Sequence, residues 1–473
     1  MPVCAIHWFR RDLRTADNPA LADALSLAER VAPLFIEPDP TMSHGPGAAS
    51  LAWLEGSLAA LDTDLHARGS TLARRIGPAP KALARAASEC GAIVVTCTRD
   101  WTPAGLAEEQ AVATVLAEAG VELHVAESQL LAPPGSLIAA SGSAYAVFTP
   151  FSRAWRTALR PVATLLAPDH IPTAVLGSQS ADAPAGAAAY DVTFAWTPGE
   201  AGARRLLGEF VRDGLEGYAT GRDLPGVRGT SELSPHLAWG EISPRQVVEA
   251  VSAATDDATA WPFLRQLAWR EFACHVLVAH PSSLDGPLRS EFAAFPWRED
   301  AAGLEAWLEG RTGYPLVDAG MRQLAETGWM HNRVRLVAAS LLVKDLLVPW
   351  QTGEEAFRNR LVDYDPAANA FNWQWVAGSG ADAAPYFRIF NPSLQGTRFD
   401  ADGTYVRRWV PELARLSPRW VQQPWLASEA ELRAAGVTLG RTYPRPVVDH
   451  AEARVRALAA LRSIKGRRDA TSQ

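Results

Sequence analysis

The chain has 473 residues, a formal net charge of −7 and four cysteines. This length is sufficient for two or three domains with a substantial core. The negative charge argues against a protein that coats nucleic acid without regard to sequence, although it is compatible with a local basic rim around a pocket. No apolar run of about 18 residues is free of charges, and no leader pattern precedes the first apolar run. We therefore expect a cytoplasmic protein without membrane spans.

The cysteines do not predict a metal site. Their positions contain no CxxC pair, so we expect neither zinc, nor a disulfide framework, nor a four-thiolate iron–sulfur cluster; they are Cys4, Cys90, Cys97 and Cys274. The three in the first hundred residues are expected to be small buried apolar side chains. The 17 tryptophans are unusual. Core filling is the simplest interpretation for most of them, and a stacking surface is the alternative.

Strand and helix patterns alternate in the first part of the chain. Short apolar runs predict buried strands at 3–9, 31–38, 92–98 and 121–127. Ala/Leu-rich stretches predict helices at 50–67 and 104–119. This alternation is typical of a doubly wound parallel sheet, although no GxGxxG fingerprint follows the first strand. We predict a Rossmann-like α/β domain over residues 1–128.

The patterns change after this region. Residues 129–196 are rich in Pro, Ala, Gly and Ser and contain one ordered-looking island, YAVFTPFSRAWRTAL, which together predict a long interdomain linker. Beyond it, strand patterns disappear and helical periodicity dominates, with capping signals at Thr197-Pro198 and Ser243-Pro244. We predict an all-helical domain over 197–464 and a disordered tail over 465–473.

Two polar clusters in the helical half could hold an anion. Thr230, Ser231 and Ser234 crowd the expected start of a helix, where hydroxyl and free N–H groups form a phosphate site. On that segment alone, ordinary capping is the favoured interpretation. The second cluster, Trp269-Arg-Glu-Phe, is preceded by Gln266. Its arginine could hold a diphosphate or a nucleic acid backbone, or it could simply be solvated.

Two further clusters combine amides, charges and aromatic rings. In Gly328-Trp-Met-His-Asn-Arg-Val-Arg, the Asn332 amide stands among large apolar residues, so we expect it to be buried and bonded to backbone or ligand. The densest cluster is Asp363-Tyr-Asp-Pro-Ala-Ala-Asn-Ala-Phe-Asn-Trp-Gln-Trp. Its carboxylates could accept from hydroxyl or amino groups, or pair with Arg335, or form a polar helix-capping loop.

Taken together, these clusters resemble the cryptochrome/photolyase family, and the bacterial cyclobutane pyrimidine dimer photolyases most closely. The resemblance begins at His7-Trp-Phe-Arg-Arg-Asp-Leu-Arg and Asp17-Asn-Pro-Ala-Leu, and continues through Gly313-Tyr-Pro-Leu-Val-Asp-Ala-Gly-Met-Arg and Trp329-Met-His-Asn-Arg. It is densest from Asn372-Trp-Gln-Trp to Ala384-Pro-Tyr-Phe-Arg-Ile-Phe-Asn-Pro. It covers nearly the whole chain and implies an α/β antenna domain joined to a helical FAD-binding domain.

The resemblance also implies site residues. Those implied for FAD are Tyr218, Thr230, Ser231, Leu233, Ser234, Phe263, Gln266, Arg270, Trp329, Asn332, Arg335, Asp363, Asp365 and Asn369. Hydroxyl groups among them would contact the phosphates, and Asp363 would pair with Arg335. An electron-transfer chain that photoreduces the flavin from the surface would consist of Trp297, Trp350 and Trp373. Those implied for the lesion and DNA are Arg222, Gln266, Trp269, Arg333, Leu336, Trp375, Arg388 and Gln395, with Trp269 and Trp375 as aromatic walls.

The activity implied by the resemblance is light-driven DNA repair. The reduced flavin absorbs blue light and passes an electron to a pyrimidine dimer flipped out of the duplex; the cyclobutane ring splits and the electron returns. We expect damaged DNA as the partner, no membrane and a monomer. The alternatives are a blue-light receptor of cryptochrome type and a (6-4) photolyase.

Single positions separate these branches. Asn369 falls where the family places a residue facing flavin N5; plant-type cryptochromes usually carry an acid there and animal types a cysteine, so the amide favours repair, unless it only satisfies backbone. Asn332 stands where (6-4) photolyases place a histidine, and His331 is expected to point elsewhere on a helix. The chain has no long C-terminal extension, which favours an enzyme.

Other positions depart from the pattern of dimer photolyases. Gln266 replaces a glutamate that bonds the lesion and would also suit a receptor without repair; Leu336 replaces a methionine, and Phe263 a tryptophan. The segment Thr98-Arg-Asp-Trp-Thr-Pro lies where antenna contacts are expected, but it lacks the Asn-Glu pair of one folate-binding pattern. A folate, an 8-hydroxy-5-deazaflavin or an empty antenna site all stay open.

Overall fold

The computed structural model describes residues 2–39, 41–159, 163–178, 194–382 and 387–471. Two compact units make up the chain, and each is described by itself. The first consists of residues 1–216, 231–281 and 362–368. The second consists of residues 217–230, 282–361 and 369–473.

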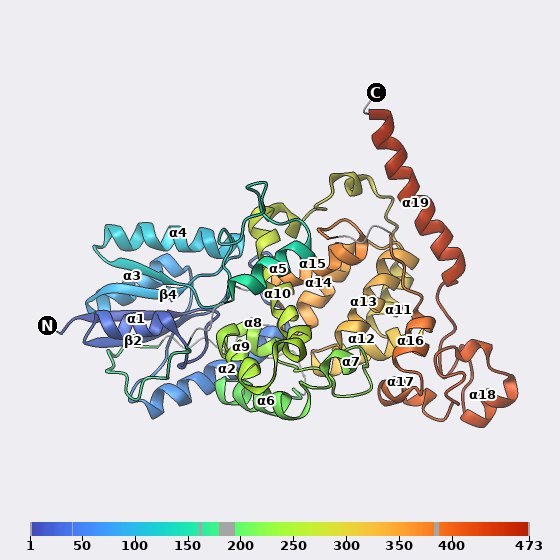
Figure 1. Ribbon diagram of the computed structural model, residues 1–473, viewed down its shortest axis with the longest axis horizontal. Coiled ribbons are helices and arrows are strands. Elements are labelled where there is room, and N and C mark those ends of the chain that lie inside the picture. The colour runs from blue at the N-terminus through green and yellow to red at the C-terminus, as the bar shows by residue number, and fades with distance from the viewer. Residues whose placement is uncertain (1, 40, 160–162, 179–193, 383–386, 472–473) are drawn as a thin grey trace. The chain divides into compact units, whose positions relative to one another are not determined.

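A five-stranded parallel sheet occupies the N-terminal part of the first unit (Figure 1). The strands lie in the order β3-β2-β1-β4-β5. Their bounds are β1 Cys4–Phe9, β2 Arg30–Ile36, β3 Ala73–Arg75, β4 Ala92–Thr98 and β5 Glu122–Ala126. Right-handed crossovers in this order put helices on both faces; these are α1 Pro19–Leu27, α2 Ala48–Ala67, α3 Ala79–Cys90 and α4 Pro103–Glu118. The predicted doubly wound α/β class is confirmed.

Helices account for the rest of both units. Those of the first unit are α5 Phe148–Ala158, α6 Glu200–Asp213, α8 Ser234–Trp239, α9 Pro244–Ala254 and α10 Asp257–Ala279. Those of the second are α7 Tyr218–Gly221, α11 Ala301–Leu308, α12 Pro315–Thr327, α13 Asn332–Ser340, α14 Trp350–Arg360, α16 Pro392–Phe399, α17 Thr404–Trp409, α18 Glu429–Ala435 and α19 His450–Thr471. Helix α15, Pro366–Ala377, begins in the first unit and continues in the second. No strand follows β5 in the described ranges, so the helical prediction is confirmed.

Four helices can be compared with the predicted domain boundaries and caps. Helix α5 lies within the ordered island that was expected in the linker 129–196. Part of that linker, but not the island, lies outside the described residues. Ser243 caps α9, as predicted, and forms a full capping box. The signal at Thr197-Pro198 was wrong, because the N-cap of α6 is Gly199. Helix α19 extends to Thr471 and so includes part of the predicted tail. The division into 1–128, 129–196, 197–464 and 465–473 stays a prediction.

The motif that opens the family resemblance forms a structural joint inside the first unit. Arg14 is buried and donates to the main-chain oxygens of Asp17 and Gly240, each at 2.8 Å. The Asp17 carboxylate pairs with Arg245 of α9 at 2.7 Å. A Cβ at Gly240, whose φ is +67°, would meet the carbonyl oxygen of Arg11 at 1.9 Å, so only glycine fits there. The joint therefore fixes the turn between α8 and α9 against the loop that follows β1.

Glu271 ties the segment after the sheet to α10. Its buried carboxylate accepts from the main-chain N–H groups of Leu131 at 2.7 Å and Ala132 at 2.9 Å, and from the indole of Trp155 at 2.7 Å. Burial raises the pKa of Glu271 from 4.5 to about 7, although these hydrogen bonds oppose the shift. The folded chain therefore keeps this proton at pH values where the unfolded chain has lost it.

This proton gives a prediction for stability. Between pH 4.5 and about 7 the folded state binds more protons at Glu271, so rising pH removes stability that is fully present below pH 4.5. Glu271→Gln cannot titrate, so its free energy of unfolding lacks this pH-dependent loss. The substitution also changes the hydrogen bonds to Leu131, Ala132 and Trp155, but that effect on stability does not depend on pH. The free energy of unfolding of the variant, relative to the parent, should rise by up to about 3 kcal/mol across that window. Urea titrations at several pH values measure the difference; a constant difference would contradict the prediction.

Candidate functional site

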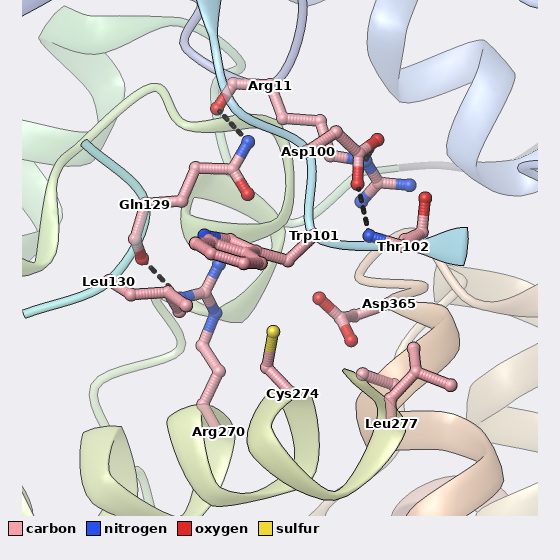
Figure 2. Close-up of a pocket in the computed structure, with 11 residues that line it drawn as sticks. Arg11, Asp100, Trp101, Thr102, Gln129, Leu130, Arg270, Cys274, Leu277 and Asp365 are labelled. Atoms are coloured by element: carbon pink, nitrogen blue, oxygen red, sulfur yellow. Dashed lines mark hydrogen bonds and ion pairs between the residues drawn. The ribbon is translucent and has the colours of Figure 1, made fainter. Parts of the chain in front are cut away.

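A pocket in the first unit brings Arg270 and Asp365, both implied for FAD, to the segment that follows β4 (Figure 2). Asp365 directs its carboxylate into the space between Trp101 and α10, and Arg270 extends from α10 toward Gln129. The pocket is lined by Arg11, Asp100, Trp101, Thr102, Gln129, Leu130, Arg270, Cys274, Leu277, Asp365 and Ala367. Two residues implied for FAD and the expected antenna segment thus line the same cavity.

The charges in this pocket suit a cofactor with a diphosphate and hydroxyl groups. Arg270 donates to the main-chain oxygens of Gln129 at 2.8 Å and Leu237 at 3.4 Å, and no carboxylate of the described residues forms an ion pair with it. Its positive charge therefore remains available to an anion. Asp365 accepts from the main-chain N–H of Ala368 at 2.8 Å, which orients its carboxylate as an acceptor for hydroxyl or amino groups. The charge of Arg270 and the acceptor oxygens of Asp365 are therefore of the kinds that the phosphate and hydroxyl groups of FAD require.

The predicted phosphate segment contains a backbone outlier. Ser234 is exposed as the first residue of α8, and the N–H of Leu233 donates to the Ser231 hydroxyl at 3.5 Å. Between them, Glu232 has φ +55°, which is unusual for a residue other than glycine. The indole of Trp196 donates to the Glu232 carboxylate at 3.0 Å. Trp196 therefore orients an acidic side chain within the predicted phosphate segment, at a residue with a strained backbone.

The face of α10 implied for cofactor and lesion is partly occupied by protein. Phe263 is buried with its ring centroid 4.6 Å from that of Phe210. The Gln266 amide donates to the Pro262 carbonyl one turn earlier, at 3.0 Å. Trp269 stacks on Phe148 at 3.4 Å with an interplanar angle of 7°. One face of Trp269 is therefore covered by α5, and its role as a lesion wall stays a prediction for the other face.

Asn369, in the second unit, is held by Glu354 of α14. Its amide nitrogen donates to the main-chain oxygen of Glu354 at 3.2 Å and to the carboxylate at 2.8 Å, and both residues are buried. These two bonds fix the orientation of the amide and include the backbone contact considered as the alternative. Its place at flavin N5 stays a prediction.

The three implied electron-transfer tryptophans all lie in the second unit, and two of them are buried. Trp373 and Trp350 are buried, at 2% and 1% exposure, whereas Trp297 is partly exposed. A Cβ at Gly353, on the same helix as Trp350, would meet the Trp373 ring at 2.1 Å, so α14 packs directly on that indole. Trp297 packs on Phe295 with ring centroids 4.4 Å apart. The partial exposure of Trp297 suits the surface end of an electron route, and the route itself stays a prediction.

Two expectations for the third cluster are wrong. Asn332 is exposed, because it is the first residue of α13 rather than an interior one. His331 lies before the helix, where its buried ring caps α13 by accepting from the N–H of Arg333 at 3.2 Å; burial lowers the pKa of His331 to about 4. Arg335 donates to the main-chain oxygen of Met330 at 2.7 Å. Asp363 belongs to the other unit, so its pairing with Arg335 stays a prediction.

Most residues implied for DNA lie in the second unit, whereas Gln266 and Trp269 lie on α10 in the first. Arg388 is exposed, with its guanidinium carbon 5.9 Å from the ring centroids of both Trp375 and Phe390. Arg333 instead forms an ion pair with Asp223 at 2.7 Å, which partly neutralises it. Others are Arg222, which lies over the buried ring of Tyr218, and Leu336 and Gln395, which are partly buried in α13 and α16. Trp329, which is implied for FAD rather than DNA, is buried. Arg388 and Trp375 are thus the predicted pair that the structure brings together.

Two general features of the described ranges bear on function. No helix there is long and apolar enough to cross a membrane. No group of three or more His, Cys, Asp or Glu side chains there is arranged to hold a metal ion. Cys4 and Cys97 are buried as predicted, whereas Cys90 is only partly buried.

Comparison with known proteins identifies the family. A family model described as the FAD binding domain of DNA photolyase matches residues 263–463, and one described as DNA photolyase matches residues 5–172. The chain belongs to the DNA photolyase family. FAD is therefore confirmed as its cofactor, and the predicted class of photo-lyase enzyme is confirmed. The photolyase fold predicted for the chain also agrees with solved members of the family.

Relatives of this photolyase family member match over nearly its full length. A deoxyribodipyrimidine photo-lyase of Agrobacterium fabrum is 46% identical, over 97% of this chain and 98% of the relative. The crystal structure of a bacterial class III photolyase from Agrobacterium tumefaciens has a TM-score of 0.92 and 43% identity, and the match covers 98% of both chains. Cryptochrome-1 of Arabidopsis thaliana is 36% identical, over 97% of this chain and 70% of the relative.

Sequence reasoning missed several partners of the photolyase site residues. Gln129 holds Arg270, Glu354 holds Asn369, and Trp196 holds Glu232. None of these three carried a local signal, because each acts through a contact between separate elements. Lys344 did carry one: it is a lysine in the apolar run LLVKDLLV.

The Trp196–Glu232 contact gives a prediction for cofactor affinity. In Trp196→Phe the Glu232 carboxylate loses one donor, so the orientation of this negative charge beside the predicted phosphate position is held less firmly. A hydrogen bond to a charged group contributes about 1.5 kcal/mol, so the FAD dissociation constant should rise about tenfold. Glu232→Gly is the contrasting variant, because glycine adopts positive φ without strain and removes the charge, so its affinity should not fall. Titration of flavin-depleted protein with FAD measures both; equal losses in the two variants would contradict the prediction.

Proposed function

We propose that the chain repairs cyclobutane pyrimidine dimers in DNA by light-driven electron transfer. The observation that carries this proposal is the pairing of Arg388 with Trp375: an exposed guanidinium for a phosphate lies beside a half-buried indole on which a flipped base can stack. A flipped dimer needs an aromatic surface and a cation together, because its bases have left the duplex stack while its backbone phosphates stay charged. The names of bacterial relatives, deoxyribodipyrimidine photo-lyases, support the same substrate.

The chain's own residues would bind and orient in this reaction. Arg270 would hold the FAD diphosphate, Asp365 would accept from its hydroxyl groups, and Asn369 would face the flavin with an amide that cannot carry a charge. Bound FAD supplies the light-driven electron. Trp297, Trp350 and Trp373 would pass electrons inward from the surface to reduce it. The exposed Asn332, in place of a histidine, favours cyclobutane dimers over (6-4) photoproducts.

A second chromophore belongs to the same proposal. Trp101 lines the pocket of Figure 2 and donates its indole N–H to Glu127 at 3.0 Å, so a ring is already fixed where antenna contacts were predicted. A fixed indole face suits a flat pigment such as a folate or an 8-hydroxy-5-deazaflavin. Release of the pigments by denaturation, followed by chromatography, distinguishes these two from FAD alone.

Illumination of purified protein with dimer-containing DNA under reducing conditions tests the proposal. Dimers should disappear in blue light and persist in the dark, and DNA that carries (6-4) photoproducts should stay unrepaired. Loss of (6-4) photoproducts alone would replace the substrate. No repair, combined with a light-induced change in flavin absorbance, would favour a receptor like the cryptochrome relative. The proposal also includes a monomer in the cytoplasm, and sedimentation of the protein with and without DNA measures the monomer state.

A further inference from the structure

A lysine is buried at the C-terminal end of α15. Lys344 lies in η4 (Leu341–Asp345), a π-helical turn, and is 1% exposed. Its Nζ donates to the main-chain oxygen of Ala377, the last residue of α15, at 2.6 Å. The same nitrogen lies 2.9 Å from the ring centroid of Phe387. In the described ranges no carboxylate forms an ion pair with it, so a helix end and an aromatic face are its partners.

The two partners of Lys344 belong to the two stretches that carry the proposed DNA pair. Ala377 follows Trp375 by two residues on α15, and Phe387 immediately precedes Arg388. Between the partners, Gly378 has φ +88°, and a Cβ there would meet the Phe387 ring at 3.1 Å and Nζ of Lys344 at 3.5 Å. The three groups are therefore packed without room for a further methyl group.

Other bonds hold this helix end but leave Phe387 untouched. Arg289 donates to the Gly378 oxygen at 3.2 Å, and the Gln374 amide donates to the Ser283 oxygen at 2.7 Å. Phe387 itself packs on Phe292 and Phe295, with ring centroids 6.5 and 6.2 Å away. Lys344 is thus a polar side chain that joins the end of α15 to the residue before Arg388.

Stability alone does not account for a lysine at this position. A cation is favoured beside helix C-terminal carbonyls and over an aromatic face. However, burial removes its hydration, and burial lowers the pKa of Lys344 well below its usual range. An apolar side chain of similar volume fills such a site as well or better. The lysine instead fixes how its two partners lie relative to each other, because its hydrogen bond to Ala377 and its contact with the Phe387 ring must be satisfied together.

We propose that Lys344 is a positioning residue for DNA: it fixes the end of α15 against Phe387, so that the Trp375 ring and the Arg388 guanidinium keep the spacing that a flipped lesion and its phosphate require. This inference rests on the proposed function. It concerns DNA recognition rather than the flavin, because Lys344 contacts none of the residues assigned to the cofactor.

The test compares Lys344→Met, which keeps the length and apolar volume, with the parent protein. Affinity for dimer-containing duplex should fall about tenfold, which corresponds to the loss of one hydrogen bond. The preference over undamaged duplex should shrink. The KM for light-driven repair should rise while kcat at saturating DNA, flavin absorbance and photoreduction stay at parental values. Lys81→Met, at an exposed lysine of α3, is the matched control and should match the parent in every measurement.

Phe387→Leu provides the second variant. It removes the ring while leaving the Lys344–Ala377 bond, and it should weaken dimer binding in the same way. The double variant should bind dimer-containing duplex no more weakly than the single variant with the lower affinity, because the two substitutions break the same link. Parental dimer affinity in either folded single variant would overturn the inference. Loss of flavin binding together with DNA binding would also overturn it, since that indicates a general packing role. If the parent itself neither bound nor repaired dimers, the proposed function would fail instead.

Discussion

Replacing Trp373 with phenylalanine is expected to stop photoreduction of the bound oxidised flavin, while repair survives when the flavin is reduced chemically. Trp373 is a buried member of the electron-transfer chain that the resemblance implies, and it packs on Gly353 and Phe357 of α14 and on Trp307, with the two ring centroids 5.0 and 6.2 Å away. A phenyl ring is much harder to oxidise than an indole, so the substitution should interrupt electron delivery without opening a large cavity. Absorbance under blue light with an external reductant measures photoreduction.

Trp307→Phe is the matched control for this prediction. Trp307 is as buried as Trp373 and donates its indole N–H to the Ala338 oxygen at 2.9 Å, so its loss disturbs the same aromatic cluster. Photoreduction should continue in this variant, because the predicted route runs through Trp350 and Trp297. Photoreduction at the parental rate in Trp373→Phe would contradict the assignment of the electron-transfer tryptophans. Slow photoreduction in both variants would mean that electrons also arrive through Trp307.

The fold was accessible from sequence because its signals are local. A strand such as β1 consists of six buried residues in a row, and Ser243 shows its cap within four residues. Strand β3 was missed, because three residues, Ala73–Arg75, are too short to show a period. Asn332 was misjudged because its neighbours are apolar; the first residue of a helix can face solvent whatever its neighbours do.

Only part of the candidate site could be predicted from the sequence. The family motifs gave Arg270, Asp365 and Asn369 their expected roles, but not the groups that orient them. Gln129 reaches Arg270 across 141 positions of the chain, and no periodicity records such a contact. Lys344 could have been singled out, since a charge within a long apolar run must be buried with a partner or break the element. Its partners, Ala377 and Phe387, were visible only in three dimensions.

Replacing Arg388 with alanine is expected to weaken DNA binding about tenfold and to lower the slope of log affinity against log salt by about one. The guanidinium is exposed and lies over two aromatic rings, so it is held in place before DNA arrives. A phosphate contact releases counterions whatever the sequence, so undamaged and dimer-containing duplexes should lose affinity alike. Fluorescence anisotropy at several salt concentrations measures both quantities.

Arg419→Ala separates this local role from a general loss of positive charge. Arg419 is also an exposed arginine of the second unit that lies over an aromatic ring, 4.6 Å from the centroid of Trp420. It has the same charge and a similar stacking contact, but none of the lesion residues is next to it in the chain. Its replacement should leave both affinity and slope near the parental values. Equal losses in the two variants would mean that DNA senses net charge alone, and an unchanged slope in Arg388→Ala would place the phosphate contact on another residue.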